Sequence, residues 1–226
     1  IRQDLFKRYA PDCFLAVTEL MLYPKDERYP DAKTIAEALW YSGFINGCMR
    51  QGDFVRIITY SASMNHGASL QKANEQIFPT PGWLAYTLYS TAEGRYPCGF
   101  ELKTPFYEVP RLPKIPNTFR EYSSPERAPL LDAFCMSSED GKILNVFLSN
   151  RSLTGEFSVP VKLTGGSFRS VTVDTLSGAR NMLDSNSLKN PDRISITSTR
   201  KSISMSSETV RIDLPSLSLV RLTFSR

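Results

Sequence analysis

FLAVTELMLYP, residues 14–24, contains the feature that decides the fold: an apolar run that ends in a carboxylate. The residues from Phe14 to Thr18 are typical of a strand that is buried on both faces, as in parallel sheets. Glu19 follows directly, and no Lys or Arg comes after it until Lys25. Because chemistry in parallel βα folds gathers at the carboxyl ends of strands, Glu19 is a candidate catalytic group. The alternative is a glutamate that caps a loop amide or pairs with a distant arginine.

The residues after this strand predict a helix, a strand and a second helix. Thr34 and Glu37 form a T-x-x-E capping box in front of apolar residues at helical spacing. The next strand is predicted at 54–62, which is mostly apolar and β-branched. Thr80-Pro81 predicts the start of the last helix, with proline in its first turn. Residues 1–94 therefore alternate strand and helix, the order that builds parallel sheets.

Two such units are too few to close a barrel, because a complete TIM barrel needs about 250 residues. If these units belong to a barrel, most of that barrel lies elsewhere. The opening segment IRQDLFKRYAPD is typical of a helix end and a loop that leads into the first strand. We therefore expect a processed chain or a fragment.

The second part of the sequence follows a different pattern. Residues 95–129 carry seven prolines and predict an extended connector, with a strand at 100–103. Residues 130–226 read as short strands separated by turns, with a hairpin around Asp140-Gly141. Since helical periodicity is absent there, we expect an antiparallel, jelly-roll-like β-sandwich. The stretch 185–207, rich in Ser, Thr and Asn, predicts a long loop.

The composition excludes some classes of function. The 226 residues are 41% hydrophobic with a formal net charge of +4, which is ordinary for a globular protein. So small a charge without a basic stripe argues against nucleic-acid binding, and no apolar run of about 18 residues predicts a membrane span. The four cysteines, Cys13, Cys48, Cys98 and Cys135, match no zinc pattern and are compatible with one or two disulfides of open pairing. The sequon at Asn150 predicts glycosylation and favours a secreted, extracellular protein.

No cofactor or metal is expected. The sequence contains no H-E-x-x-H, no clustered histidines, no D-x-D-x-D and no G-x-x-x-x-G-K. His66 is the single histidine, so a Ser-His-Asp triad would have to use it, but no G-x-S-x-G elbow is present. We expect His66 to brace its loop.

Three stretches together carry a family resemblance. These are LAVTE ending at Glu19, the helix A-E-A-L-W-Y with its R-Q-G-D exit (residues 36–53), and N-H-G at 65–67. With them the chain resembles the glycoside hydrolase family 51 α-L-arabinofuranosidases. The resemblance implies that residues 1–94 are the last βα units of a TIM-barrel catalytic domain and that residues 130–226 are the β-sandwich behind it. It also implies that Glu19 is the catalytic nucleophile.

The implied reaction is the release of terminal arabinofuranose from arabinoxylan or arabinan with retention of configuration. Such hydrolysis needs a second carboxyl group about 5–5.5 Å from the nucleophile, as acid and base. The resemblance implies that this group belongs to an Asn-Glu pair upstream of the nucleophile. Asn74-Glu75 comes after Glu19, so we interpret it as a loop feature. We therefore expect a companion chain that carries the N-terminal part of the enzyme.

Substrate contacts are expected in the loop after the second strand. The resemblance implies that Gln76 binds arabinose hydroxyls, although an exposed loop amide would look the same in sequence. Asn65, at the tip of that strand, is a further candidate. Many members of the family have an aromatic residue just after the nucleophile, and here Leu20 stands there.

Two other functions fit the sequence. The first is an endo-glucanase or xylanase of the same family, because pocket shape decides between these substrates. The second is a non-catalytic carbohydrate-binding fragment centred on the sandwich.

Overall fold

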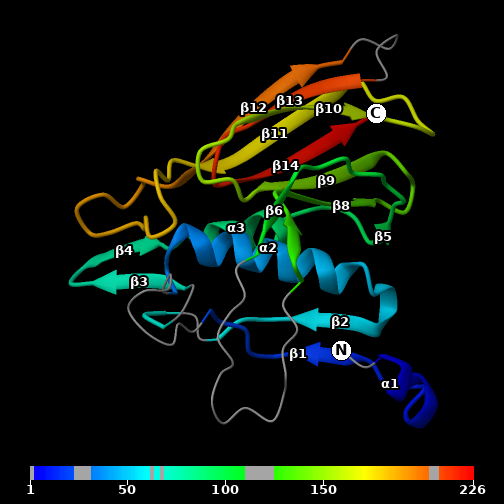
Figure 1. Cartoon of the computed structure of the whole chain (residues 1–226), viewed down its shortest axis with the longest axis horizontal. Helices are drawn as coiled ribbons and strands as arrows, with labels where there is room; N and C mark the ends of the chain where they lie inside the picture. The colour runs from blue at the N-terminus through cyan, green and yellow to red at the C-terminus, as the bar shows by residue number, and fades with distance from the viewer. Residues whose placement is uncertain (1–2, 23–31, 62–63, 67–68, 110–124, 204–208) are drawn as a thin grey trace.

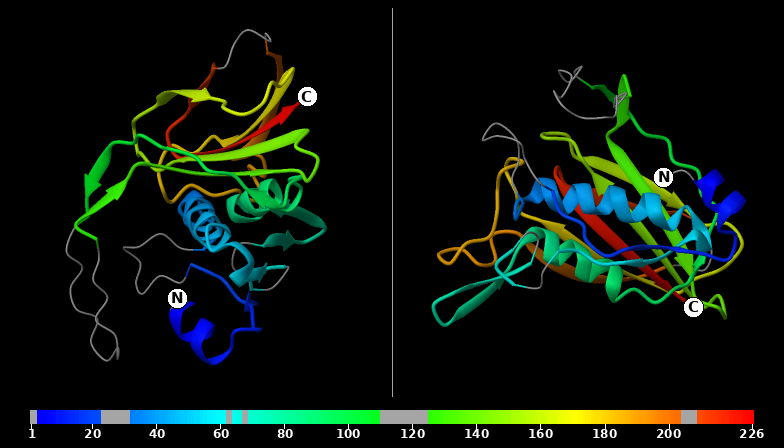
Figure 2. Two further views of the ribbon diagram at one scale, coloured as in Figure 1. Left: turned by 90° about the vertical axis from the view of Figure 1, so that its right-hand side faces the viewer. Right: turned by 90° about the horizontal axis from the view of Figure 1, so that it is seen from below.

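The computed structural model describes residues 3–22, 32–61, 64–66, 69–109, 125–203 and 209–226. In this part of the chain, two helices lie between a short parallel sheet and a larger antiparallel sheet, and a further antiparallel strand pair covers the far side (Figures 1 and 2). The predicted combination of an α/β part and a β-sandwich is therefore confirmed. The barrel itself is not seen, because the parallel sheet has two strands in the described residues.

The N-terminal part contains the predicted strand–helix–strand unit. Its elements are α1 Gln3–Tyr9, β1 Leu15–Val17, α2 Ile35–Met49, a 3-10 turn Gly52–Phe54, β2 Val55–Ile58, β3 Leu70–Ala73, β4 Gln76–Pro79 and α3 Pro81–Ser90. Strands β1 and β2 pair in parallel, with α2 as the connection between them. None of the described helices has both the length and the apolar content needed to cross a bilayer.

The start of α2 is where the sequence predicts it, but the capping differs. Thr34 is the N-cap residue with extended backbone, yet its side chain makes no capping bond to the helix. The N–H groups of Ile35 and Ala36 instead donate to the carbonyls of Asp184 (2.9 Å) and Met182 (3.3 Å), in the loop before β12. The sandwich thus satisfies N–H groups that a helix leaves open at its first turn.

Both ends of α3 are fixed by side chains. Thr80 accepts a hydrogen bond from the Trp83 N–H at 3.2 Å, and Pro81 occupies the first turn, as the sequence predicts. At the other end, Arg221 of the sandwich donates to the Leu88 carbonyl at 2.9 Å. A cation is favourable there because carbonyl groups accumulate at the helix C-terminus.

In the described residues the sandwich consists of one six-stranded antiparallel sheet and the β10–β13 pair. The order in the larger sheet is β12-β11-β14-β9-β8-β5, and β10 pairs with β13. The strands from β5 onward are β5 Tyr96–Pro97, β6 Phe106–Glu108, β7 Arg127–Pro129, β8 Leu131–Ser137, β9 Ile143–Asn150, β10 Phe157–Lys162, β11 Ser170–Ser177, β12 Ser195–Ser202, β13 Thr209–Leu214 and β14 Ser218–Ser225. The predicted hairpin joins β8 to β9, and Gly141 has the positive φ of 64° that favours glycine.

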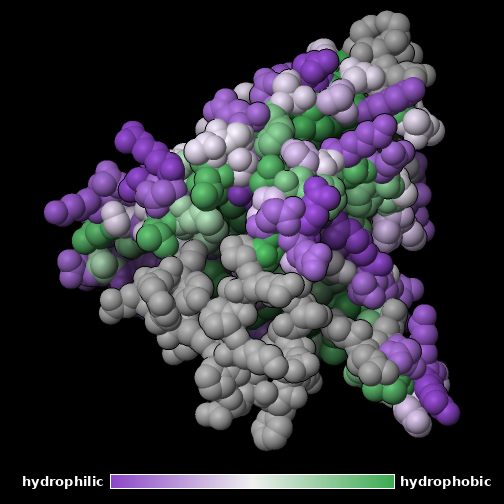
Figure 3. All heavy atoms as spheres, viewed as in Figure 1, coloured by the Kyte–Doolittle hydropathy of each residue, from purple (hydrophilic) through white to green (hydrophobic). Residues whose placement is uncertain are grey.

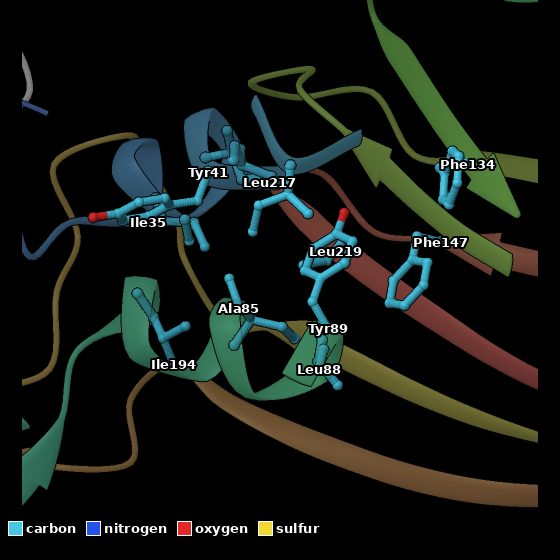
Figure 4. Packing of buried hydrophobic residues seen from close by; sticks show 14 of the residues in the cluster. Ile35, Tyr41, Ala85, Leu88, Tyr89, Phe134, Phe147, Ile194, Leu217 and Leu219 are labelled. Carbon is cyan, nitrogen blue, oxygen red and sulfur yellow. The ribbon is translucent and has the colours of Figure 1, made fainter. Parts of the chain in front are cut away.

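The side chains of the large sheet alternate between two cores. On β14, Leu219 faces the helices, whereas Val220 and Leu222 face the β10–β13 pair. Figure 4 shows the first core, in which residues of α2, α3 and the sandwich meet. There the rings of Tyr89 on α3 and Phe147 on β9 stack at 4.2 Å between centroids. The helices therefore share one core with the sandwich.

Three expectations about local structure are wrong. The predicted loop 185–207 contains β12, because alternating Ser and Thr side chains suit an exposed edge strand and β11 supplies its hydrogen-bond partners. Residues 100–103 form no strand; the connector pairs instead through β5 and through β6. The loop expected after the second predicted strand contains the β3–β4 hairpin, residues 70–79. The proline run 110–116 lies outside the described residues.

The outer surface of the sandwich is mixed in character. On the face seen in Figure 3, hydrophilic and hydrophobic side chains are intermingled over the sandwich.

Asp132 on β8 joins α2 to the sandwich. Its carboxylate accepts from Asn46 (2.9 Å) and Arg50 (2.5 Å) of α2 and lies 3.3 Å from an Arg151 nitrogen, while its side chain is 13% exposed. We expect Asp132→Ala to lower the free energy of unfolding by about 2–4 kcal/mol, because it removes the carboxylate that two guanidinium groups and an amide share. Urea denaturation of the chain measures the loss.

Asp140→Ala is the matched control for this prediction. Asp140 also pairs with a cation, Lys142 at 2.8 Å, but both side chains are more than half exposed. An exposed pair contributes little, so this variant should unfold like the wild type. Equal loss in the Asp132 and Asp140 variants would contradict the assigned role of Asp132.

Candidate active site

Glu19 lies where β1 ends, two residues after Val17. Its side chain is exposed, whereas the next residue, Leu20, is buried in the core under the helices. β1 and β2 are parallel, so their carboxyl ends point to the same edge. The structure therefore presents Glu19 at this edge, as the sequence predicts for a residue at a strand tip.

The backbone on both sides of Glu19 is held by hydrogen bonds. The Thr18 carbonyl accepts from the Thr59 hydroxyl at 2.8 Å, which ties it to the chain that leaves β2. The Leu20 carbonyl accepts from the Ser61 N–H at 3.3 Å and from the Tyr41 hydroxyl at 2.5 Å. A carboxylate on a backbone restrained at both neighbours has few positions available.

Glu37 fixes the next part of the same segment. This residue of α2 is fully buried, and its carboxylate accepts from the Leu22 N–H at 3.2 Å and from the Lys33 N–H at 2.7 Å. The first turn of a helix is a favourable place for a negative charge. Glu37 thus accepts from Lys33, the residue before the N-cap, and from Leu22, so it also supports the segment after Glu19.

The surroundings of Tyr41 keep its hydroxyl group protonated, so that it can donate a hydrogen bond. Burial, followed by the nearby Glu37 carboxylate, raises its pKa well above the usual value, so the hydroxyl stays protonated. Its ring packs 5.9 Å from that of Tyr60, which in turn lies 4.9 Å from Tyr86. The Tyr86 hydroxyl donates to the Ile58 carbonyl on β2 at 3.1 Å. Tyr41 of α2 and Tyr86 of α3 therefore each donate a hydrogen bond to a backbone carbonyl, one just after β1 and one at the end of β2.

Sequence reasoning missed Glu37 and Tyr41 as site residues. They are four positions apart on α2, so they share one face of the helix. Glu37 and Tyr41 lie across the helix from Ile35 and Leu39, but α2 is buried on both sides. The available signal was that Tyr41 and Cys48 recur at helical spacing on the side of Glu37. A buried carboxylate requires polar partners, and the exit of the adjacent strand supplies them.

Asn65 and His66 brace the connection after β2. The Asn65 side chain accepts from the Lys72 N–H at 2.6 Å, and its backbone has a positive φ of 59°. The N–H of His66 donates to the Ser69 hydroxyl at 3.1 Å. This bond uses the backbone of His66, so the bracing role expected for its side chain stays a prediction. The Asn65 carbonyl oxygen is committed to the loop, and its substrate role stays a prediction.

Gln76 begins β4, directly after the turn of the β3–β4 hairpin. The turn residues are Asn74, with φ of 55°, and Glu75, and the pair Ala73–Gln76 closes it. Asn74-Glu75 is therefore a loop feature, as interpreted from the sequence. Gln76 is exposed, which both readings of this residue allow.

The expected glycosylation of Asn150 is not supported by the structure. Asn150 is fully buried at the end of β9, and its amide nitrogen donates to the carbonyls of Gly155 (2.8 Å), Leu214 (3.3 Å) and Pro215 (2.8 Å). A glycan attaches to this nitrogen, so it would displace the hydrogen bonds that close the end of the sandwich. The sequon is explained by this structural role of Asn150.

Glu19 lines neither of two open hollows in the described residues. One, of about 700 Å³, lies along the loop between β11 and β12, and the other, of about 500 Å³, lies between α1 and the start of β2. In the described residues no three His, Cys, Asp or Glu side chains are grouped as metal ligands would be. Within the described residues the site is thus an open edge at which the carboxylate of Glu19 is exposed.

Comparison with known proteins gives one family and a consistent set of folds. The family described as "Alpha-L-arabinofuranosidase C-terminal domain" matches residues 16–218. Among curated proteins no match is found.

The solved structures listed next are similar in fold. An α-L-arabinofuranosidase from Thermotoga maritima, in complex with arabinose, has a TM-score of 0.75 at 20% identity, over 94% of this chain and 43% of that one. The GH51 arabinofuranosidase from Xanthomonas axonopodis pv. citri has a TM-score of 0.76 at 18% identity, over 99% and 44%. CelM2, a bifunctional glucanase-xylanase from a metagenome library, has a TM-score of 0.59 at 15% identity, over 99% and 33%.

This chain spans less than half the length of each of these three structures. At such identities the likeness shows the fold alone, while the family match extends over most of the sequence. The chain therefore belongs to the family of α-L-arabinofuranosidase C-terminal domains.

Proposed function

We propose that the chain is part of a retaining glycoside hydrolase that releases terminal α-L-arabinofuranosyl residues from arabinoxylan or arabinan. Glu19 is the nucleophile in this proposal. The observation that carries it is the position of Glu19: an exposed carboxylate on a restrained backbone at the carboxyl edge of a parallel strand pair. Membership in a family of arabinofuranosidase domains supports the choice of bond.

The mechanism follows from the residue type. The ionised Glu19 attacks the anomeric carbon of arabinofuranose, while an acid protonates the leaving oxygen, and a covalent glycosyl-enzyme forms. The same acid, now a base, activates water, which releases the sugar. Gln76 and Asn65 are proposed to bind the sugar hydroxyls. Neither cofactor nor metal takes part in these steps.

The acid/base residue is proposed to lie on a companion portion of the enzyme. Two observations support a partner at the β1–β2 sheet. Phe14 and Ile57, next to and on these strands, are large apolar residues that are 44% and 45% exposed. Within the described residues each strand has one paired edge, and such open edges normally bind further strands. The companion would supply the other strands of a TIM barrel.

A second candidate keeps the fold and changes the bond. The likeness to CelM2, a glucanase-xylanase, favours an endo-acting glucanase or xylanase as the alternative. Its TM-score of 0.59 is lower than that of the arabinofuranosidases at 0.75 and 0.76.

We also propose that the enzyme is secreted and acts outside the cell.

The test uses the enzyme assembled from this chain and its companion portion. We expect it to hydrolyse p-nitrophenyl α-L-arabinofuranoside and to release arabinose whose first-formed anomer, followed by NMR, has the configuration of the substrate. Faster cleavage of xylan or glucan than of the arabinofuranoside would favour the second candidate. If the assembly binds polysaccharide but hydrolyses none of these substrates, the result would favour a non-catalytic carbohydrate-binding fragment. An inverted anomer would contradict the nucleophile role of Glu19.

A further inference from the structure

Two cysteines face each other where the chain passes from the helices into the sandwich. β5 pairs with β8 in antiparallel register, with Tyr96 opposite Ser137 and Pro97 opposite Met136. One more step of this register places Cys98 opposite Cys135. The N–H of Cys98 donates to the Cys135 carbonyl at 3.0 Å, so the pairing continues to this position.

The distance between opposite residues suits a disulfide bond. Opposite residues of an antiparallel pair have Cα atoms about 4.5–5.5 Å apart, and disulfides form when this distance is about 4.4–6.8 Å. Directly opposite side chains also project to the same face of a sheet. The Cys135 thiol already lies against the backbone of its neighbour, because its sulfur donates to the Cys98 carbonyl at 3.2 Å. Both thiols are free in the structure.

We propose that Cys98 and Cys135 are a disulfide-forming pair that fastens the edge strand β5 to the sandwich. With glutathione disulfide as the oxidant, the Cys98 thiolate attacks one sulfur and releases one glutathione thiolate. The deprotonated Cys135 sulfur then attacks Cys98 in the mixed disulfide and releases the second. Two protein thiols and one glutathione disulfide thus yield one protein disulfide and two molecules of reduced glutathione.

The two cysteines differ in ways that set this order. Cys98 is half-buried, whereas Cys135 is 5% exposed. Burial, then the neighbouring Cys98 thiol, raises the pKa of the Cys135 thiol to about 12. Few Cys135 sulfurs are therefore thiolates at neutral pH, and the closing step should accelerate as the pH is raised from 7 to 9.

The position gives the bond a structural consequence. β5 has two residues and forms the outer edge of the large sheet, immediately after α3. Few backbone bonds fasten it, so it is a place where the sheet can open. A disulfide would hold the exit of α3 against β8 and would join residues 98 and 135 covalently, which limits the freedom of the unfolded chain between them.

The test measures the pairing directly in this chain. The folded protein is incubated in a glutathione redox buffer, blocked with N-ethylmaleimide in denaturant and digested with trypsin without reduction. We expect one linked species that joins peptides 96–103 and 128–142 and that separates on reduction. Cys13 and Cys48, an exposed and a buried thiol, should both carry the maleimide.

Two variants make the result decisive. Cys98→Ser should abolish the linked species and lose the rise in melting temperature that oxidation gives the wild type. Cys13→Ser, which removes the exposed thiol, should leave both unchanged. Maleimide on both Cys98 and Cys135 after oxidation, or a link from either of them to Cys13 or Cys48, would overturn the proposal.

Discussion

Glu19→Gln is expected to lower kcat/KM of the assembled enzyme by about 10³-fold or more on p-nitrophenyl α-L-arabinofuranoside. Glutamine keeps the size of the side chain and removes the anionic oxygen that forms the glycosyl bond. Because the Glu19 side chain is exposed and the bonds that restrain this segment are made by the carbonyls of Thr18 and Leu20, folding should be unaffected. Initial rates and a melting curve, recorded side by side, measure the two properties.

Glu75→Gln is the matched control. It makes the same chemical change in an exposed glutamate of the β3–β4 turn, in the dipeptide that looks like an acid/base motif. This variant should keep wild-type kcat/KM. Azide gives a further check: with Glu19→Ala it should take the place of the missing carboxylate and yield an arabinosyl azide of inverted configuration. Wild-type turnover by Glu19→Gln would refute the assignment of the nucleophile.

Tyr41→Phe is expected to lower kcat by about 10- to 100-fold with KM little changed. The variant removes the 2.5 Å hydrogen bond to the Leu20 carbonyl and leaves only the longer bond from Ser61. A reacting group that is displaced by a fraction of an ångström loses much of its rate. Since the Tyr41 hydroxyl is protonated at all working pH values, the pH profile should keep its shape. Separate values of kcat and KM are the measurement.

Tyr86→Phe is the control for this second prediction. Tyr86 is also a helical tyrosine that donates to a carbonyl at a strand exit, but it is only partly buried, and its partner is Ile58 on β2 and not a residue next to Glu19 in sequence. Both variants should lose about 1 kcal/mol of stability, as expected for one hydrogen bond. Only Tyr41→Phe should show a lower kcat. Equal effects on kcat would mean that Tyr41 acts through general stability.

The signals that predicted the fold correctly are local ones. Thr80-Pro81 predicted the start of α3 because capping and proline geometry depend on neighbouring residues alone. The turn at Asp140-Gly141 predicted the β8–β9 hairpin for the same reason. The expectations that were wrong concern segments whose structure depends on residues far away in the sequence. β12 is a strand because β11 lies beside it. The first N–H groups of α2 are bound by the loop before β12 and not by the Thr34 side chain.

The residues of the candidate site also fall into those that the sequence could predict and those that it could not. Glu19 could be found because an acid at the end of an apolar run is visible in a single stretch of sequence. Its supports could not, because Tyr41 and Ser61 meet the Leu20 carbonyl only after the chain has folded. Asn150 shows the opposite failure: a three-residue motif predicted an exposed glycan, and the fold buries the side chain.

The core shared by α2, α3 and the large sheet has a consequence for engineering. The helices that shape the exit of β1 rest their other side on residues such as Phe147 and Leu219. Removing the sandwich would strip these helices of their support, and the edge that carries Glu19 would loosen with them. A graft of this edge onto another scaffold would therefore have to transfer strands, helices and sandwich as one inseparable block.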